Sequence, residues 1–290
     1  MARIAYVNGR YRPLPEARVH VEDRGFQFAD GVYEYWSIMD ARLADADGHL
    51  DRLDRSLREL QIPQPMTRAA LVQVLRETVR RNRLVDGSLY LQITRGACRR
   101  DHPFPTTPLR PTVVAIARPV DFALVNARAA RGVGVLTQAD QRWGRCDIKT
   151  VGLLPNVLAK QAAREAGAFE AWLVDEAGLV TEGSSTNAWI VDDQGRLRTR
   201  DTDANILRGV TRLHLIDLAK SLQIPVLETP FTVQEAQAAK EAFFTAASAF
   251  ITPVVSIDGV MIGDGRPGPV STRLRALYYE EARRLAYWPR

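Results

Sequence analysis

Lysine is scarce in this chain, and one lysine stands in a setting suited to covalent chemistry. Of the 39 basic residues only four are lysines, and Lys149 is the one outside a helix-like run. Lys149 ends a short extended segment and precedes an apolar segment and a helix start at Pro155. An amine in such surroundings loses hydration, which makes its neutral, nucleophilic form accessible near neutral pH. A Schiff-base lysine needs that property, although a lysine that only packs its stem on apolar surface would have the same local sequence.

A second candidate is the segment from Leu207 to Arg212, with the sequence LRGVTR. It begins an amphipathic helix with Gly209, Val210 and Thr211. Unpaired N–H groups at a helix N-terminus and a threonine hydroxyl can together bind a phosphate dianion. The segment is not a Walker A sequence, which ends in Gly-Lys-Ser or Gly-Lys-Thr. A plain helix start explains it equally well.

A third candidate is Glu182, which lies between a predicted strand and a group of small hydroxyl residues, in the sequence VTEGSSTN. Such a carboxylate is either a turn residue or the group that holds a proton on a heteroaromatic nitrogen. The loop RRDHPFP supplies a fourth candidate, in which Arg100 and His102 could bind a carboxylate from a proline-stiffened backbone. A solvated basic loop is the alternative. The sequence contains no serine nucleophile elbow, HExxH motif or paired catalytic carboxylates that would compete with these candidates.

The composition is that of a globular protein without nucleic-acid or membrane partners. The 290 residues carry a formal net charge of +5, but the basic residues are interleaved with 34 acidic ones and form no stripe with aromatics between them. Two cysteines are too few for a disulfide framework and lack metal-site spacing, which predicts a cytoplasmic protein without a metal. We expect a soluble, unprocessed protein, because the first twenty residues contain no apolar core of signal-peptide length and no later apolar run is long enough to span a bilayer.

Hydrophobic patterning predicts an α+β protein in two parts. Asn8-Gly9 indicates a hairpin turn between short strands, the leucines at 50, 53, 57 and 60 indicate a helix, and Thr67 can cap a second one. The expected strands span 31–39, 88–94, 112–117, 133–137, 170–174, 179–181, 187–191, 225–228, 243–245, 254–257 and 260–262, and further helices span 156–166, 210–222 and 271–286. Thr232 and Glu235 form a capping box. We expect a loop over 20–30, a domain over 1–118, a linker over 119–127 and a second domain over 128–290.

Taken together, these motifs resemble those of fold-type IV (class IV) pyridoxal-phosphate aminotransferases, and within that family the D-amino acid aminotransferases. The segments EDRGFQFADGVYE, GHLDRLDRS, YLQITRG, RRDHPFP, RCDIKT, VLAKQAA, TEGSSTN, NILRGVTR and ITPV occur in the family's order and spacing over nearly the whole chain. The resemblance implies a smaller N-terminal α/β domain, a larger C-terminal pseudo-barrel domain and a homodimer. It also implies that the enzyme moves the amino group of D-alanine or a similar D-amino acid to 2-oxoglutarate or another 2-oxo acid by a ping-pong mechanism.

The resemblance also implies roles for individual residues. Lys149 would form a Schiff base with pyridoxal 5'-phosphate and carry the proton between the substrate Cα and the cofactor. Glu182 would pair with the pyridine nitrogen. The remaining cofactor residues would be Arg52, Val210, Thr211 and the turn containing Ala247 at the phosphate, with Ser185 and Leu207 near the ring. The substrate carboxylate would be bound by Tyr33 and by Arg100 and His102, the last two from the partner subunit.

One position departs from the family pattern. Where D-amino acid aminotransferases usually carry hydroxyl residues near the phosphate, this chain has Ala246 and Ala247, followed by Ser248. Backbone N–H groups there can still bind phosphate. A branched-chain L-amino acid transaminase, an (R)-amine transaminase and an aminodeoxychorismate lyase are the alternatives within the family. Outside it, a phosphate-dependent or RNA-binding protein would use the positive charge without pyridoxal phosphate.

Overall fold

The computed structural model describes residues 3–203 and 205–289, which fold into two compact units. Unit 1 comprises residues 3–121, 148–152 and 283–289, and unit 2 comprises residues 122–147, 153–203 and 205–282. The short segment that carries Lys149 therefore belongs with the N-terminal part of the chain and not with its own sequence neighbours. The contacts divide the chain after residue 121, inside the range 119–127 expected for a linker, and helix α4 (Phe122–Arg131) occupies most of that range.

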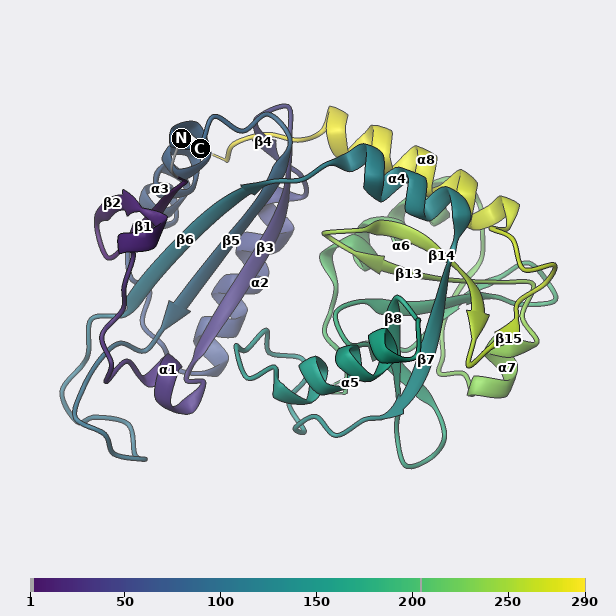
Figure 1. Ribbon diagram of the computed structural model, residues 1–290, viewed down its shortest axis with the longest axis horizontal. Helices are drawn as coiled ribbons and strands as arrows, with labels where there is room; N and C mark the ends of the chain where they lie inside the picture. Colours follow the sequence, from purple (N-terminus) through teal and green to yellow (C-terminus); the bar gives the residue numbers. More distant parts are fainter. Residues whose placement is uncertain (1–2, 204, 290) are drawn as a thin grey trace. The chain divides into compact units, whose positions relative to one another are not determined.

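Unit 1 contains an antiparallel sheet with two long helices. Among the described residues its six strands have the order β2-β1-β6-β5-β3-β4. The strands are β1 (Ile4–Val7), β2 (Arg10–Pro13), β3 (Gly31–Met39), β4 (Arg42–Leu43), β5 (Gly87–Thr94) and β6 (Thr112–Pro119). The helices are η1 (Leu14–Glu16), α1 (Arg24–Phe28), α2 (Ala46–Glu59) and α3 (Arg68–Arg81). In Figure 1, β3, β5 and β6 lie side by side and α2 runs along this sheet.

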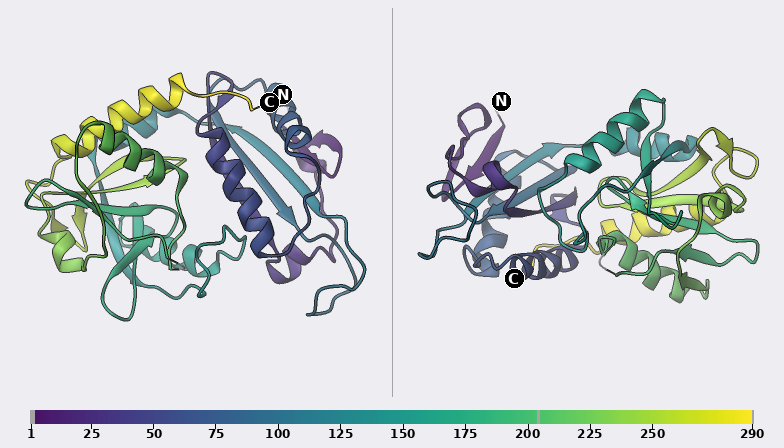
Figure 2. Two further views of the ribbon diagram at one scale, coloured as in Figure 1. Left: turned by 180° about the vertical axis from the view of Figure 1, so that it is seen from behind. Right: turned by 90° about the horizontal axis from the view of Figure 1, so that it is seen from below.

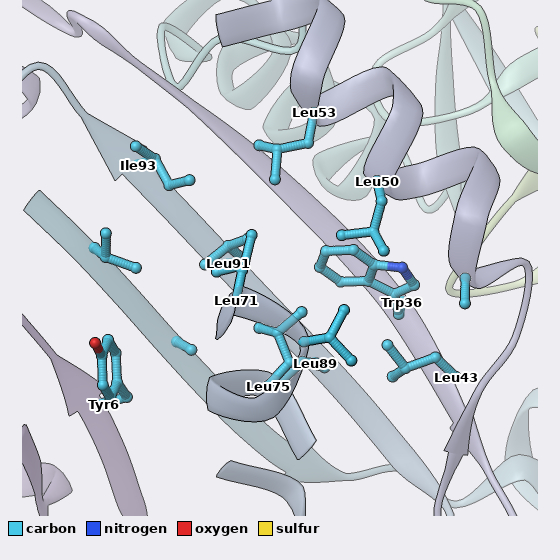
Figure 3. Close-up of a cluster of buried hydrophobic side chains, with 14 of the residues drawn as sticks. Tyr6, Trp36, Leu43, Leu50, Leu53, Leu71, Leu75, Leu89, Leu91 and Ile93 are labelled. Carbon is cyan, nitrogen blue, oxygen red and sulfur yellow. The ribbon is translucent and has the colours of Figure 1, made fainter. Parts of the chain in front are cut away.

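The core of unit 1 forms because α2 places its leucines on one face. Leu50, Leu53 and Leu57 recur at helical spacing and are buried. They belong to the same apolar cluster as Trp36 of β3 and Leu89 of β5, and Figure 3 shows Leu50 and Leu53 pointing from the helix toward the strands. The helix expected from the leucine pattern is confirmed.

Local signals in unit 1 account for most of its boundaries. Asn8 and Gly9 have φ angles of 47° and 91°, as the predicted hairpin turn requires. Thr67 caps α3 by accepting a hydrogen bond from the N–H of Ala70 at 3.3 Å. The expectation of a continuous loop over 20–30 was wrong. Asp23 accepts a hydrogen bond from the N–H of Gly25 and so caps the short helix α1.

Unit 2 is built on a larger, mixed sheet. In the described residues nine strands form it, in the order β12-β11-β10-β13-β14-β7-β8-β9 with β15 beside β14. The strands are β7 (Val133–Ala139), β8 (Glu170–Val174), β9 (Val180–Gly183), β10 (Asn187–Val191), β11 (Leu197–Thr199), β12 (Val226–Glu228), β13 (Glu241–Ala246), β14 (Phe250–Ile257) and β15 (Val260–Met261). Strand β7 is parallel to β8 and β14, and the other pairings except β11 with β12 are antiparallel.

Helices accompany this sheet, and two of them run together. They are α4, α5 (Leu154–Glu165), α6 (Val210–Ser221), α7 (Val233–Gln237) and α8 (Pro269–Arg284). Helices α4 and α8 lie side by side (Figures 1 and 2), where Arg275 donates a hydrogen bond to the side-chain oxygen of Asn126 at 2.7 Å. The capping box predicted from Thr232 and Glu235 begins α7. Helices and mixed sheets in two units confirm the expected α+β class.

Among the helices of the described residues, none combines the length and the apolar character needed to cross a membrane.

Candidate active site

Lys149 is fixed at the edge of β3 through its main chain. The N–H of Tyr33 donates to the carbonyl of Lys149 at 3.0 Å, and Val32 pairs with Thr150 in an isolated β-bridge. The N–H of Lys149 donates to the hydroxyl of Ser56 at 3.4 Å. The side chain is half-buried, with Nζ 4.1 Å from the ring centroid of Tyr33. The structure thus brings together the predicted nucleophile and one predicted substrate-binding residue.

Arg52, which the resemblance assigns to the phosphate, belongs to a buried ion network. Its Nε and Nη2 donate to the two carboxylate oxygens of Glu34 at 2.7 and 2.8 Å, and His49 Nδ1 lies 2.8 Å from the same carboxylate. Burial alone would raise the pKa of Glu34, but the charge and hydrogen bonds of Arg52, with a hydrogen bond from His49, lower it to about 2. Burial lowers the pKa of His49 and outweighs the opposing effect of Glu34. The carboxylate is therefore ionised and the imidazole neutral, and Arg52 is held in one orientation.

Glu34 and His49 were not predicted to be part of this network. The signal was present in β3, where Val32, Glu34 and Trp36 alternate on one buried face. A carboxylate on the apolar face of a strand requires a partner.

Arg100 and His102 lie on the exposed loop between β5 and β6, and both pack against Phe28. The guanidinium carbon of Arg100 is 4.7 Å from the Phe28 ring centroid, and the His102 ring centroid is 5.5 Å from it. The loop backbone is held by buried Arg24, which donates to the carbonyls of Asp101 and His102 at 2.7 and 3.2 Å. Within residues 3–203 and 205–289, no hydrogen bond or ring contact joins either side chain to Tyr33.

Glu182 stands near the end of β9, buried and held from several directions. Its Oε1 accepts hydrogen bonds from the guanidinium of Arg142 and from the N–H of Leu207 at 3.1 Å. Its Oε2 accepts from Nδ2 of Asn187 at 2.9 Å, and the same Nδ2 donates to the carbonyl of Leu207 at 2.9 Å. Leu207, predicted to lie near the cofactor ring, therefore contacts Glu182 through its main chain.

Arg142 links Glu182 to a second carboxylate. Its Nε and Nη2 donate to Asp140 at 2.9 and 2.7 Å, and the hydroxyl of Thr181 donates to Asp140 at 2.7 Å. Burial would raise the pKa of Asp140, but the hydrogen bonds and charge of Arg142 lower it. Burial opposes the charged form of Arg142, yet Asp140 and Glu182 raise its pKa above the usual value. Asp140 and Arg142 were not predicted to have a role, although they stand in the segment DQRWGRCDIK that leads to the candidate lysine.

Val210 and Thr211 occupy the first turn of α6, where no side chain caps the helix. Gly209 precedes them, and a Cβ at this position would lie 2.0 Å from Oδ1 of Asn187. The helix start consequently lies against the side chain that also holds Glu182. Thr211 is buried, and its hydroxyl accepts a hydrogen bond from the hydroxyl of Tyr278 at 3.5 Å.

Ala247 lies in the turn between β13 and β14, and β13 pairs with β10, the strand that carries Asn187. Thr245 of β13 pairs with Asn187 of β10 and with Ile251 of β14. Helix α6 packs against β13. The uncapped helix start and the turn containing Ala247 are therefore connected through Asn187 and its strand partner.

Ser185, predicted to lie near the ring, is bound to a buried carboxylate. Its hydroxyl donates to Glu170 at 2.9 Å, and the hydroxyl of Ser184 donates to the same carboxylate. Lys160 Nζ lies 3.2 Å from Glu170. The small hydroxyl residues after Glu182 thus have a structural partner of their own in unit 2.

Comparison with known proteins identifies the family. The family model described as Amino-transferase class IV matches residues 31–257, so the chain belongs to that family, with the fold-type IV architecture. It is 38% identical over 270 residues to the D-alanine aminotransferase of Staphylococcus haemolyticus, covering 93% of this chain and 94% of the relative. It is 40% identical over 268 residues to that of Bacillus licheniformis, covering 92% and 93%.

Solved structures agree on the fold. A branched-chain amino acid aminotransferase from T.th., solved with pyridoxamine 5'-phosphate, superposes with a TM-score of 0.89 at 29% identity, covering 98% of this chain and 96% of that one. The Escherichia coli branched-chain amino acid aminotransferase superposes with a TM-score of 0.86 at 27% identity, covering 97% of this chain and 94% of that one.

Proposed function

We infer that this protein is a pyridoxal-phosphate-dependent D-amino acid aminotransferase. It moves the amino group of D-alanine or a similar D-amino acid to 2-oxoglutarate or another 2-oxo acid. The observation that carries this inference is the similarity to D-alanine aminotransferases along 93% of the chain. The motifs around Lys149 and Glu182 lie inside the region that matches the class IV family.

The residues at the start of α6 fit a phosphate attached to a pyridine ring. The uncapped first turn at Val210 and Thr211 provides N–H donors and the positive end of a helix dipole. Gly209 allows this turn to approach Asn187, whose amide also holds Glu182. Donors for a phosphate and an acceptor for a ring nitrogen are thus anchored to one side chain.

When bound, pyridoxal phosphate supplies an electron-withdrawing ring that stabilises negative charge at the substrate Cα. We assign Lys149 as the amine that binds the cofactor and then carries a proton to and from Cα at Nζ. The main chain of Lys149 is hydrogen-bonded to Tyr33 and Ser56, which fixes the point from which its side chain extends. Glu182 would hold the proton on the ring nitrogen, with Arg142 preventing rotation of the carboxylate.

The remaining roles are proposed from the resemblance. Arg52, Val210, Thr211 and the Ala247 turn would bind the phosphate, and Ser185 and Leu207 would lie near the ring. The substrate carboxylate would be bound by Tyr33 and by Arg100 and His102 from a partner subunit. The exposure of Arg100 and His102 and the anchoring of their loop by Arg24 support this last assignment.

We further propose that the protein acts as a homodimer in the cytoplasm. Cys98 and Cys146 are both free thiols, which fits a reducing compartment. Light scattering on the purified protein tests the dimer, and a monomer that is fully active with D-alanine would contradict it.

A single-turnover experiment tests the function. Enzyme loaded with pyridoxal phosphate should change from the pyridoxal to the pyridoxamine absorption spectrum on addition of D-alanine, whereas an aminodeoxychorismate lyase would not make this change with D-alanine. A donor panel of D-alanine, D-glutamate, L-leucine and (R)-1-phenylethylamine then ranks the substrates. Equal use of D- and L-alanine would remove the basis for the carboxylate assignment.

A branched-chain L-amino acid aminotransferase is the second candidate, because solved enzymes of that type share the fold over nearly the whole chain. Faster conversion with L-leucine than with any D-amino acid would support it over the first.

A further inference from the structure

Helix α8 contacts both elements to which we assign the cofactor phosphate. Arg275 and Tyr278 lie one helical turn apart and are buried. Arg275 Nη1 donates to the carbonyl of Ala249, the last residue of the turn between β13 and β14, at 2.8 Å, and to that of Ile251, the second residue of β14. The hydroxyl of Tyr278 reaches Thr211 at the start of α6.

Arg275 is a buried cation without an acidic partner in the described part of the chain. Its Nη2 donates to the amide oxygen of Asn126 at 2.7 Å, and its Nη1 bonds are to carbonyls. Burial lowers its pKa to about 10, with a smaller opposing effect from Tyr279, so the guanidinium stays charged at neutral pH. A buried charge that meets only neutral acceptors costs stability. A role in holding the turn would explain why an arginine stands at this buried position.

Where the turn held by Arg275 enters β14, the backbone adopts a conformation that needs support. Phe250, between the two carbonyls bound by Arg275, has a φ of 59° and is buried. A bulky residue rarely adopts this left-handed conformation unless its surroundings impose it. The hydroxyl of Thr252 adds a second donor to the carbonyl of Ala249 at 2.9 Å. The path of the chain out of the turn is therefore fixed by side chains from two elements.

Because Ala246 and Ala247 lack polar side chains, the backbone geometry of the turn determines how these two residues can bind an anion. At these two positions the turn offers an anion only its main-chain N–H groups. A hydroxyl can rotate to meet a phosphate oxygen, whereas an N–H direction is set by the backbone dihedral angles. The contribution of this turn to phosphate binding then depends on how firmly the backbone is held.

We propose that Arg275 is a positioning residue for the cofactor phosphate. It holds the β13–β14 turn so that the main-chain N–H groups there face the phosphate, and Tyr278, one turn along the same helix, fixes Thr211 on the second phosphate-binding element. Arg275 acts through the turn and does not itself contact the cofactor. This inference rests on the proposed function, because it assumes that a phosphate binds at the start of α6.

Comparing two ligands that differ only in the phosphate tests this role. The dissociation constants of pyridoxal phosphate and of pyridoxal are measured by titrating the cofactor-free enzyme, for the wild type and the variants Arg275→Met and Tyr278→Phe. Arg273→Met, on the exposed side of the same helix, is the matched control. We expect Arg275→Met to weaken pyridoxal phosphate binding about tenfold and Tyr278→Phe about threefold, as loss of hydrogen-bonded support predicts, with pyridoxal binding unchanged.

Two outcomes would overturn the proposal. In one, both variants bind pyridoxal phosphate as tightly as the wild type. In the other, pyridoxal and pyridoxal phosphate lose affinity equally, which would indicate general damage to packing. If Arg275→Met does not fold, Arg275→Lys keeps the charge with fewer donors, and Tyr278→Phe gives an independent reading. A wild type that binds no pyridoxal phosphate refutes the proposed function itself, whereas normal wild-type binding with unaffected variants refutes only the role of Arg275.

Discussion

The guanidinium of Arg142 is shared between two carboxylates, donating to Glu182 with one nitrogen and to Asp140 with the others. Because Nε and Nη2 of Arg142 are both bound to Asp140, the guanidinium cannot turn with the Glu182 carboxylate if that carboxylate rotates. Charge-assisted bonds of this kind fix orientation as well as adding free energy. We propose that Arg142 keeps the Glu182 carboxylate aimed at the cofactor ring nitrogen.

Replacing Arg142 with Met should lower kcat about tenfold to a hundredfold while the enzyme still binds pyridoxal phosphate, since one charge-assisted hydrogen bond to Glu182 is lost. Steady-state kinetics and the absorption spectrum of the bound cofactor measure the two effects separately. Arg145→Met is the control, because Arg145 lies in the same loop and pairs with Asp147, its side chain 44% exposed. An unchanged kcat in Arg142→Met would show that Glu182 keeps its orientation without this contact.

Lys149→Ala should abolish turnover, because no other amine would take its place in the reaction. Borohydride reduction of the wild type loaded with pyridoxal phosphate, followed by peptide mapping, should find the label on Lys149. Lys220→Ala, a change at an exposed lysine on α6, should leave activity near that of the wild type. Label on another lysine, or full activity in Lys149→Ala, would refute the proposed mechanism.

Structural features that depend on neighbouring residues were predicted correctly from the sequence. The hairpin turn at Asn8-Gly9 and the caps at Thr67 and Thr232 were predicted because each motif is complete within a few residues. The short helix α1 was missed, since its cap at Asp23 lies in a polar stretch without hydrophobic periodicity. Helix α4, which begins inside the range expected for the linker, was not predicted, although its sequence contains helix formers.

In the candidate site, contacts between residues far apart in the sequence were not predicted. Lys149 and Glu182 were candidates from their sequence context, and the resemblance to the family gave them their roles, but their supporting residues were not identified. Arg142 meets Glu182 across 40 residues of sequence, and Arg52 meets Glu34 across 18. Because either arginine could pair with many acidic residues in a chain containing 34 of them, the choice of partner is made by the tertiary fold.

Arg100→Ala should raise KM for D-alanine about tenfold, with little effect on the affinity for pyridoxal phosphate, since a charge-assisted contact to the substrate carboxylate would be lost. Arg99→Ala, at the adjacent exposed position, is the control.

Packing of Arg100 against Phe28 leads to a second expectation. Phe28→Ala should also raise KM for D-alanine, because the guanidinium of Arg100 loses the ring against which it packs. Equal losses in cofactor binding and KM would point to a structural role for the loop instead.

The buried carboxylate of Glu34 predicts how stability depends on pH. Its pKa is about 2 in the folded chain, against an ordinary value of 4.5 that applies to the unfolded chain. Its contribution to the free energy of unfolding is therefore present above pH 4.5 and is lost as the pH falls through 2. His49 acts in the same direction, since its lowered pKa means that protonation below pH 6.5 favours the unfolded chain. The free energy of unfolding should therefore decrease as the pH falls from 6.5 toward 2.

Glu34→Gln tests this dependence, because it removes the charge while keeping the shape. At pH 7 the variant should be less stable by about 3 kcal/mol, since the ion pair between Arg52 and the buried Glu34 carboxylate is lost. Between pH 4.5 and 2 its stability should change less than that of the wild type. Urea denaturation at pH 7, 4 and 3 measures both effects. Glu77→Gln, which breaks solvent-exposed pairs with Arg80 and Arg81, should have a much smaller effect because water and salt screen those pairs. If the two variants lost the same stability, burial of the Glu34 network would not be what sets its contribution.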